Sequence, residues 1–186
     1  MWALFRLSIG VIFLTLLPGC ALQQRDLKLA GQRRALEQQR QELAHNRELL
    51  EDLRRRNLKA TETERGVVVT LPDVLFEFGQ ARLTLEAWSK TRDMAQIFTT
   101  QARDRRIAVE GHTDAIGSES FNQELSEQRA YQVTSALMAD GVDPLRITSK
   151  GYGERYPIAA NTYQDGLDNP QGRQKNRRVE VVVENR

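Results

Sequence analysis

One carboxylate and one guanidinium, those of Asp114 and Arg129, could together form a binding site for a zwitterion. Asp114 lies in a Gly-bracketed turn after a predicted strand, and Arg129 lies fifteen residues further on, inside the next predicted helix. Asn122, Leu125 or Ser126, and Arg129 are separated by three, four and seven positions, which places them on one helical face. We therefore expect both charges at one edge of a sheet, where a ligand with an ammonium and a carboxylate on one carbon could meet both. Arginine suits the carboxylate because its planar group can donate two parallel hydrogen bonds.

A plainer interpretation of the same residues stays open. Asp114 could serve only as a turn residue, and Arg129 could be a surface charge paired with Asp114 or with Glu124. Spacing alone favours this plainer interpretation.

The sequence offers little to an enzyme or to a metal site. His112 and Asp114, with Glu110 beside them, could be imagined as a metal site. A catalytic zinc generally takes three protein ligands, and at the end of a strand these residues more often serve in hydrogen bonding. The only other histidine, His45, lies in a different segment. The chain has no Ser-His-Asp or Cys-His arrangement, and the Gly151–Gly153 stretch lacks the helix start that a phosphate-binding loop requires. We expect no catalysis, no metal and no cofactor.

Charge and length narrow the class of protein further. The 27 basic and 25 acidic residues give a net charge of only +2, so there is no electrostatic case for nucleic acid. A chain of 186 residues suggests one ordinary domain and an additional segment.

Residues 1–19 have the pattern of a secretory signal peptide. The apolar run from Ser8 to Leu17 is about ten residues long, whereas a membrane-spanning helix needs about 20. Small residues and the single cysteine, Cys20, follow this run. The alternative is a soluble protein with an apolar N-terminal strand and a buried cysteine, which fits the pattern less well.

The stretch from Gln23 to about Arg65 predicts a long helix. It contains no proline and one glycine, and it is rich in Arg, Glu, Gln and Leu, which favour helices. Leucine recurs every seventh residue, at Leu22, Leu29, Leu36, Leu43 and Leu50. A coiled coil needs apolar residues at two positions of each heptad, and most companion positions here are polar. We expect a narrow apolar stripe, and leave open whether this segment is a solvated spacer or a coiled coil that oligomerises.

From Gly66 onward the pattern alternates between strands and helices, which indicates an α/β sandwich with one sheet covered on one face by two helices. Strands are expected at 67–71, 74–78, 107–109, 147–152 and 179–183, and helices at 83–102 and 121–138. The stretch from Pro157 to Asn176 has no clear periodicity, so we expect either a functional loop or a short element that the pattern misses.

Several segments of this part resemble the C-terminal domain of OmpA, in a family that also includes Pal and MotB. They are VLFEFGQARL from Val74, EGHTDAIGSESFNQELSEQRA from Glu110, GYGE from Gly151 with Pro157, and GRQKNRRVEV from Gly172. The resemblance spans about 66–184. It implies a βαβαββ two-layer sandwich that binds the meso-diaminopimelate of peptidoglycan stem peptides.

By motif position, the resemblance assigns roles to individual residues. Asp114 and Arg129 would hold the free amino and carboxylate groups of diaminopimelate, and Asn122 and Leu125 would line the same pocket. Phe78 and Gly79 match a loop that presses against the ligand. Many relatives carry Asp or Asn in place of Gly79, so a contact through the backbone would survive here and one through the side chain would not. Arg177 and Arg178 match a further element of the family that could touch ligand or support the sheet.

The segment ending in Gly19-Cys20 resembles a bacterial lipoprotein signal. The resemblance implies cleavage before Cys20, acylation of that cysteine and, with Ala21 next, sorting to the outer membrane. The expected organisation is a signal peptide over 1–19, a lipidated cysteine and helical spacer over 20–65, and a peptidoglycan-binding domain over 66–186. The expected function is that of a periplasm-facing outer-membrane lipoprotein that tethers this membrane to the cell wall. The alternative is an adaptor that recruits envelope protein partners through its Arg-rich helix, with wall binding secondary.

Overall fold

The computed structural model describes residues 18–77 and 79–186, with side chains from residue 23 onward. The expected signal peptide therefore lies almost wholly outside the described residues, as do Phe78 and the Cys20 side chain. None of the described helices is both long enough and apolar enough to cross a membrane. The chain divides into two compact units, residues 1–41 and 42–186.

The described part of the first unit is helical. Helix α1 (Pro18–Arg55) begins there, and every residue from 23 to 41 is exposed. The heptad leucines Leu29 and Leu36 are 43% and 50% exposed. Over residues 23–41, the apolar stripe expected from the sequence is therefore exposed in the part of the chain that the structure describes.

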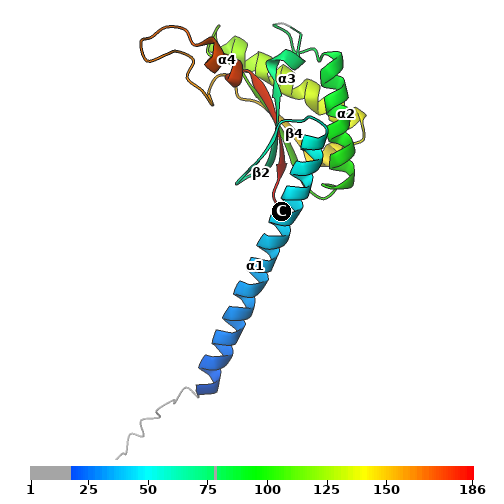
Figure 1. Cartoon of the computed structure of the whole chain (residues 1–186), viewed down its shortest axis with the longest axis vertical. Helices are drawn as coiled ribbons and strands as arrows, with labels where there is room; N and C mark the ends of the chain where they lie inside the picture. The colour runs from blue at the N-terminus through cyan, green and yellow to red at the C-terminus, as the bar shows by residue number, and fades with distance from the viewer. Residues whose placement is uncertain (1–17, 78) are drawn as a thin grey trace, which may run out of the picture. The chain divides into compact units, whose positions relative to one another are not determined.

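The second unit is built on a five-stranded sheet (Figure 1). The strands are β1 (Ala60–Thr63), β2 (Gly66–Pro72), β3 (Ile107–His112), β4 (Ile147–Gly151) and β5 (Arg178–Glu184), in the spatial order β1-β2-β5-β3-β4. Neighbouring strands are antiparallel except β3 and β4, which are parallel because helix α3 connects them.

Two helices, α2 (Leu85–Thr100) and α3 (Glu119–Ala139), cover one face of this sheet (Figure 1). Strand side chains alternate between faces, so Val67, Val69 and Leu71 of β2 join the main core with the helices. Val68 lies on the opposite face, in a small cluster with Ala108 and Val182. The order β2-α2-β3-α3-β4-β5 confirms the predicted βαβαββ sandwich.

Residues 42–65 differ from the prediction of one helix up to Arg65. Helix α1 ends at Arg55, and β1 adds an edge strand to the sheet. Asn57 has a positive φ of 56°, Leu58 donates its N–H to the Leu53 carbonyl (3.0 Å), and Asn57 donates to the Arg54 carbonyl (2.9 Å). This is the hydrogen-bond pattern by which a left-handed residue ends a helix, and asparagine tolerates that conformation better than most residues.

The last turns of α1 belong to the globular body. Leu49 and Leu53 are fully buried in the main core. Arg105, in the turn before β3, donates hydrogen bonds from Nη2 to Glu42 (2.7 Å) and to Asn46 (2.8 Å), both on α1. The structure therefore packs residues 42–65, which the sequence assigned to a spacer, onto the domain expected to begin at Gly66.

Two shorter elements also correct the sequence analysis. The expected extended piece over 74–78 begins instead with a 3-10 turn, η1 (Asp73–Leu75), after which Phe76 bridges Leu83. The unassigned stretch 157–176 contains helix α4 (Pro170–Asn176), whose N-cap Asn169 accepts a hydrogen bond from the Gly172 N–H (3.0 Å). A further 3-10 turn, η2 (Pro144–Arg146), precedes β4.

Candidate functional site

The sheet itself brings the candidate residues to one of its ends. Strands β2 and β3 end, and the antiparallel β5 begins, at the same level: Arg178 is in register with Pro72 on one side and with His112 on the other. Asp73 follows Pro72 in the chain, Asp114 comes two residues after His112, and Arg177 precedes Arg178. Three charged residues from distant parts of the sequence therefore meet at this end of the sheet.

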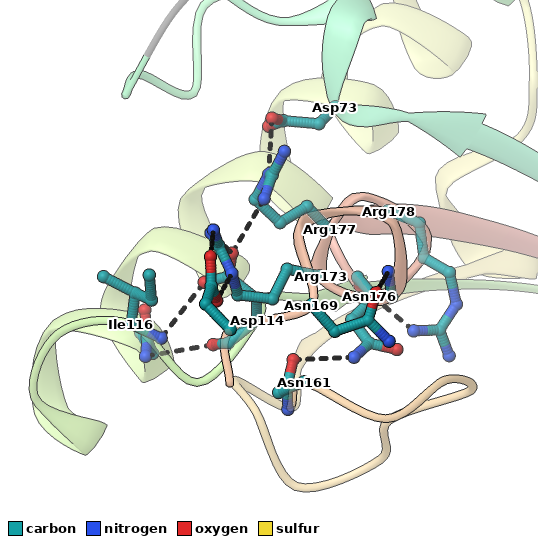
Figure 2. Close-up of polar contacts among 12 residues, drawn as sticks. Asp73, Asp114, Ile116, Asn161, Asn169, Arg173, Asn176, Arg177 and Arg178 are labelled. Atoms are coloured by element: carbon teal, nitrogen blue, oxygen red, sulfur yellow. Dashed lines mark hydrogen bonds and ion pairs between the residues drawn. The ribbon is translucent and has the colours of Figure 1, made fainter. Parts of the chain in front are cut away.

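Asp114 is held by the turn that follows β3. Its Oδ1 accepts a hydrogen bond from the backbone N–H of Ile116 (3.1 Å). Its Oδ2 lies 2.7 Å from Nη1 of Arg177 and 3.3 Å from Nη1 of Arg173 (Figure 2). The Asp114 side chain is only 8% exposed, so this carboxylate depends on those guanidinium groups for compensation of its charge.

Arg129 comes from the buried face of α3. Its Nη2 lies 2.7 Å from Oδ1 of Asp73, its Nε donates to the Gln80 carbonyl (3.1 Å), and its guanidinium carbon lies 5.0 Å from the centre of the Phe76 ring. The side chain is 3% exposed. Burial lowers the pKa of Arg129, while the neighbouring Asp73 carboxylate acts in the opposite direction.

Helix α3 can lie this close to the sheet because β3 carries Gly111. A Cβ on that residue would lie 2.0 Å from the backbone oxygen of Ser126. Any side chain at position 111 would force α3, and Arg129 with it, away from β3 at this end of the sheet.

Asp73 and Arg177 connect the two predicted ligand-binding charges. Nε of Arg177 lies 2.8 Å from Oδ2 of Asp73, and Nη1 of Arg177 contacts Asp114 (Figure 2). The other carboxylate oxygen of Asp73 contacts Arg129. The result is a row of alternating charges, Asp114–Arg177–Asp73–Arg129, which we name the ion-pair chain. The pKa of Arg177 is raised: burial alone would lower it, but the hydrogen bonds to Asp73 and Asp114 outweigh that effect.

The plainer interpretation of Asp114 and Arg129 paired them with each other or with Glu124. Among the described residues, the ion-pair partners are instead Arg173 and Arg177 for Asp114, and Asp73 for Arg129. Both residues are buried, and the ion-pair chain places them in one charge network. They are therefore not independent surface charges.

The remaining predicted site residues lie around this network. Asn122 is buried, and its Nδ2 donates to the Asp114 carbonyl (3.2 Å) and to Glu154 (2.6 Å). Leu125 and Gly79 line a neighbouring hollow of about 340 Å³, to which Gln80, the partner of Arg129, also contributes. Gly79 has a φ of 67°, a conformation that glycine adopts freely and that Asn and Asp tolerate better than other residues.

Arg178 has a different role from Arg177. Its Nε lies 2.5 Å from Glu180, and its Nη1 donates to the Asn176 carbonyl (3.1 Å). These contacts support β5 and the end of α4. Of the two arginines that the motif left undecided, Arg177 joins the ion-pair chain and Arg178 braces the sheet.

A second charged cluster lies on the sheet face opposite the helices. Glu110, His112 and Glu180 offer ligand atoms within 4.8 Å of one another, but Glu110 pairs with Arg65 (2.6 Å) and Glu180 pairs with Arg178. The two arginines therefore balance the charges of the two carboxylates without a metal ion. Burial and the nearby Arg178 lower the pKa of His112 from 6.5 to about 4, so its ring is neutral at neutral pH.

Asp73, Arg173 and Gln80 were missed by the sequence analysis. Arg173 lies in α4, and Arg177, four positions later, is the C-cap residue that directly follows this helix. This spacing could have suggested a shared role had that short helix been expected. Asp73 carries no such signal, because its partner Arg177 lies 104 positions away in the chain.

The comparisons with known proteins identify the family of the domain that carries this site. Residues 75–177 match the model of the OmpA family. The chain belongs to the OmpA family. Outer membrane porin F of Pseudomonas fluorescens is 40% identical over 112 residues, which are 60% of this chain and 32% of that porin. The chain spans a third or less of the length of several of the curated relatives it matches, so the likeness concerns only part of each of those proteins.

Solved structures with the OmpA-like fold extend the likeness. A putative MotB-like protein from Desulfovibrio vulgaris is 29% identical with a TM-score of 0.65, over 83% of this chain and 99% of that one. The cell wall anchor of the type VI secretion system (T6SS) from Pseudomonas aeruginosa is 28% identical with a TM-score of 0.60, over 75% of this chain and 96% of that one.

Proposed function

We propose that this protein binds peptidoglycan non-covalently through the diaminopimelate of stem peptides and tethers the outer membrane to the cell wall, without catalysing a reaction. The observation that carries the proposal is that Asp114 and Arg129, both buried, are the two ends of one ion-pair chain in an OmpA-family domain. A carboxylate and a guanidinium in one network match the ammonium and carboxylate that diaminopimelate presents on a single carbon.

The relatives support a role in the cell envelope. One is named an outer membrane porin, and one solved neighbour is described as a cell wall anchor. Those names belong to the relatives, and they favour wall binding for a domain that shares their fold.

We expect binding to a single stem peptide to be weak. A hydrogen bond to a charged group contributes about 1.5–3 kcal/mol, and association has an entropic cost that offsets much of this. The wall, however, is a polymer that presents the same group many times. Repeated ligand and membrane anchoring both raise the effective concentration, so a weak site can retain the protein at the wall.

The anchor in this proposal is an acylated Cys20, which precedes the exposed stretch of α1. Several acyl chains would anchor the protein stably, since each buried CH2 contributes about 0.8 kcal/mol and a single chain is marginal. Replacing the cysteine, Cys20→Ser, should leave the precursor unprocessed and release it from membranes in fractionated cells. Normal processing of that variant would exclude the lipoprotein assignment.

The decisive experiment for wall binding is co-sedimentation of the full chain with purified sacculi. We expect Asp114→Ala and Arg129→Ala each to lose most of the bound fraction. The matched control is Asp93→Asn, which removes a comparable carboxylate from an exposed pair with Arg56 (2.9 Å) away from the sheet edge. Sedimentation of both alanine variants at the wild-type level would contradict the diaminopimelate site.

That contrary result would favour the adaptor function. The exposure of every residue from 23 to 41, including several arginines, leaves this part of α1 available to an envelope protein. The two functions are compatible, and only the variants at the sheet edge separate them.

A further inference from the structure

The middle of the ion-pair chain has the charges of the proposed ligand. The guanidinium of Arg177 contacts Asp114, where the ligand ammonium would bind (Figure 2). The carboxylate of Asp73 contacts Arg129, where the ligand carboxylate would bind. Arg177 and Asp73 are also paired with each other, at 2.8 Å. Together they present a cation and an anion side by side, as the headgroup of an amino acid does.

We propose that the Arg177–Asp73 pair is an internal stand-in for this headgroup, and that these two residues determine the specificity of the site for zwitterions. The inference rests on the proposed function and adds to it how the site selects its ligand. An incoming headgroup displaces the pair from Asp114 and Arg129 and takes its place.

The exposure of the four side chains favours displacement of the middle rather than the ends. Arg177 and Asp73 are 28% and 25% exposed, whereas Asp114 and Arg129 are 8% and 3% exposed. The middle pair can turn toward water without losing its own contact. The end residues are held in the body by the β3 turn and by α3, and cannot follow it.

Displacement by a zwitterion leaves no charge without a partner. Two contacts are broken, Arg177 to Asp114 and Asp73 to Arg129, and the ligand forms two of the same kind. The Arg177–Asp73 contact persists. Arg173 keeps its own pair with Asp168, at 2.7 Å, whether or not it stays near Asp114.

A ligand with a single charge does not achieve this balance. The four residues of the ion-pair chain carry two positive and two negative charges, so a zwitterion preserves neutrality, whereas an amine or a carboxylate alone adds one charge. Because Arg177 and Asp73 move together, an amine at Asp114 would also leave Arg129 without an anion. A buried charge without a partner is costly, and this cost selects against such ligands.

The same arithmetic predicts that two single variants change the specificity in opposite directions. Asp73→Asn leaves the ion-pair chain with one excess positive charge, so it should accept a ligand that carries only carboxylates. Arg177→Gln leaves one excess negative charge, so it should accept a ligand that carries only amines.

Three small molecules with related carbon skeletons test this: meso-diaminopimelate, pimelate, which lacks its amino groups, and 1,5-diaminopentane, which lacks its carboxylates. Saturation-transfer NMR on the full chain in detergent gives the affinity for each. We expect the wild type to bind diaminopimelate at least about tenfold more tightly than either analogue, since each charged contact is worth that much or more. Asp73→Asn should gain about tenfold for pimelate alone, and Arg177→Gln should gain about tenfold for 1,5-diaminopentane alone.

The outcomes separate this inference from the proposed function. Binding of pimelate or 1,5-diaminopentane by the wild type as tightly as diaminopimelate would overturn the stand-in and leave wall binding in place. Weaker pimelate binding by folded Asp73→Asn, with Asp93→Asn unchanged, would overturn it as well. A wild type that binds none of the three and does not sediment with sacculi would overturn the proposed function itself. The wild-type comparison needs no variant, so the test does not depend on how a substitution affects folding.

Discussion

The guanidinium of Arg105 lies 2.8 Å from the side-chain oxygen of Asn46, and both residues are buried, at 2% exposure each. The same guanidinium donates from Nε to the Glu184 carbonyl (2.8 Å). One cation therefore joins the end of α1 to the end of β5, two segments that lie at opposite ends of the domain's sequence.

Replacing this cation should destabilise the domain. We expect Arg105→Ala to lower the free energy of unfolding by about 2–4 kcal/mol, because several hydrogen bonds to a charged group are lost and their buried partners are left unsatisfied. Urea denaturation followed by circular dichroism measures the effect. Arg186→Ala is the control, since its pair with Asp104 (2.9 Å) is exposed and should contribute less than about 1 kcal/mol. Equal effects of the two variants would contradict a structural role for Arg105.

Two leucines of α1 should respond differently to truncation. Leu53 is fully buried in the main core, so Leu53→Ala should lower the free energy of unfolding of the domain by about 2–5 kcal/mol. Leu36 is 50% exposed in the other unit, so Leu36→Ala should change it by less than about 0.5 kcal/mol. The free energy of unfolding of both variants is measured by the same urea titration. A small effect of Leu53→Ala would mean that α1 does not pack on the domain in solution.

The closeness of α3 to β3 predicts a linked loss of stability and wall binding. The Cβ of Gly111→Ala would meet the Ser126 backbone oxygen at 2.0 Å, which no side-chain rotation relieves. Overpacking of this kind costs about 1–3 kcal/mol, and the displaced helix carries Arg129. Sacculus binding should therefore fall in a variant that still folds by circular dichroism. Gly31→Ala is the control, because nothing lies within 4 Å of the added Cβ.

Stability should decrease below neutral pH because of His112. Its pKa is 6.5 in the unfolded chain and about 4 in the folded protein, where burial and Arg178 disfavour the charged ring. Between these two values the unfolded state binds more protons, so the free energy of unfolding falls as pH falls from 6.5 to 4 and then levels off for this group. The loss amounts to about 3 kcal/mol.

Urea titrations at pH 7 and pH 4.5 measure this decrease. Carboxylates also begin to titrate near the lower value, so the relevant quantity is the difference between the wild type and His112→Gln. The variant should lose much less stability across this range. Parallel decreases in both proteins would show that other groups are responsible.

The sequence by itself determined the elements with strong local signals. The valine run before Pro72 and the apolar periodicity of α2 and α3 depend on neighbouring residues, and a strand and two helices formed where these signals predicted them. The predicted stop at Gly111 was wrong, because β3 continues through Gly111 to His112. The sequence also predicted that Asp114 and Arg129 lie at one end of the sheet, and the ion-pair chain joins them there. Short elements with weak periods, α4 and η1, were not found, and Asn57 was not recognised as the end of α1.

Only the tertiary structure decided which charges meet. Asp73, Asp114 and Arg177 come together because β2, β3 and β5 share a register at one end of the sheet, and no local pattern encodes that register. The burial of Leu49 and Leu53 likewise depends on a surface formed by later residues, so the composition of α1 alone resembled a spacer throughout. Contacts between distant residues follow from the packing of whole helices and strands, whereas each helix or strand is determined mainly by residues that are close together in the sequence.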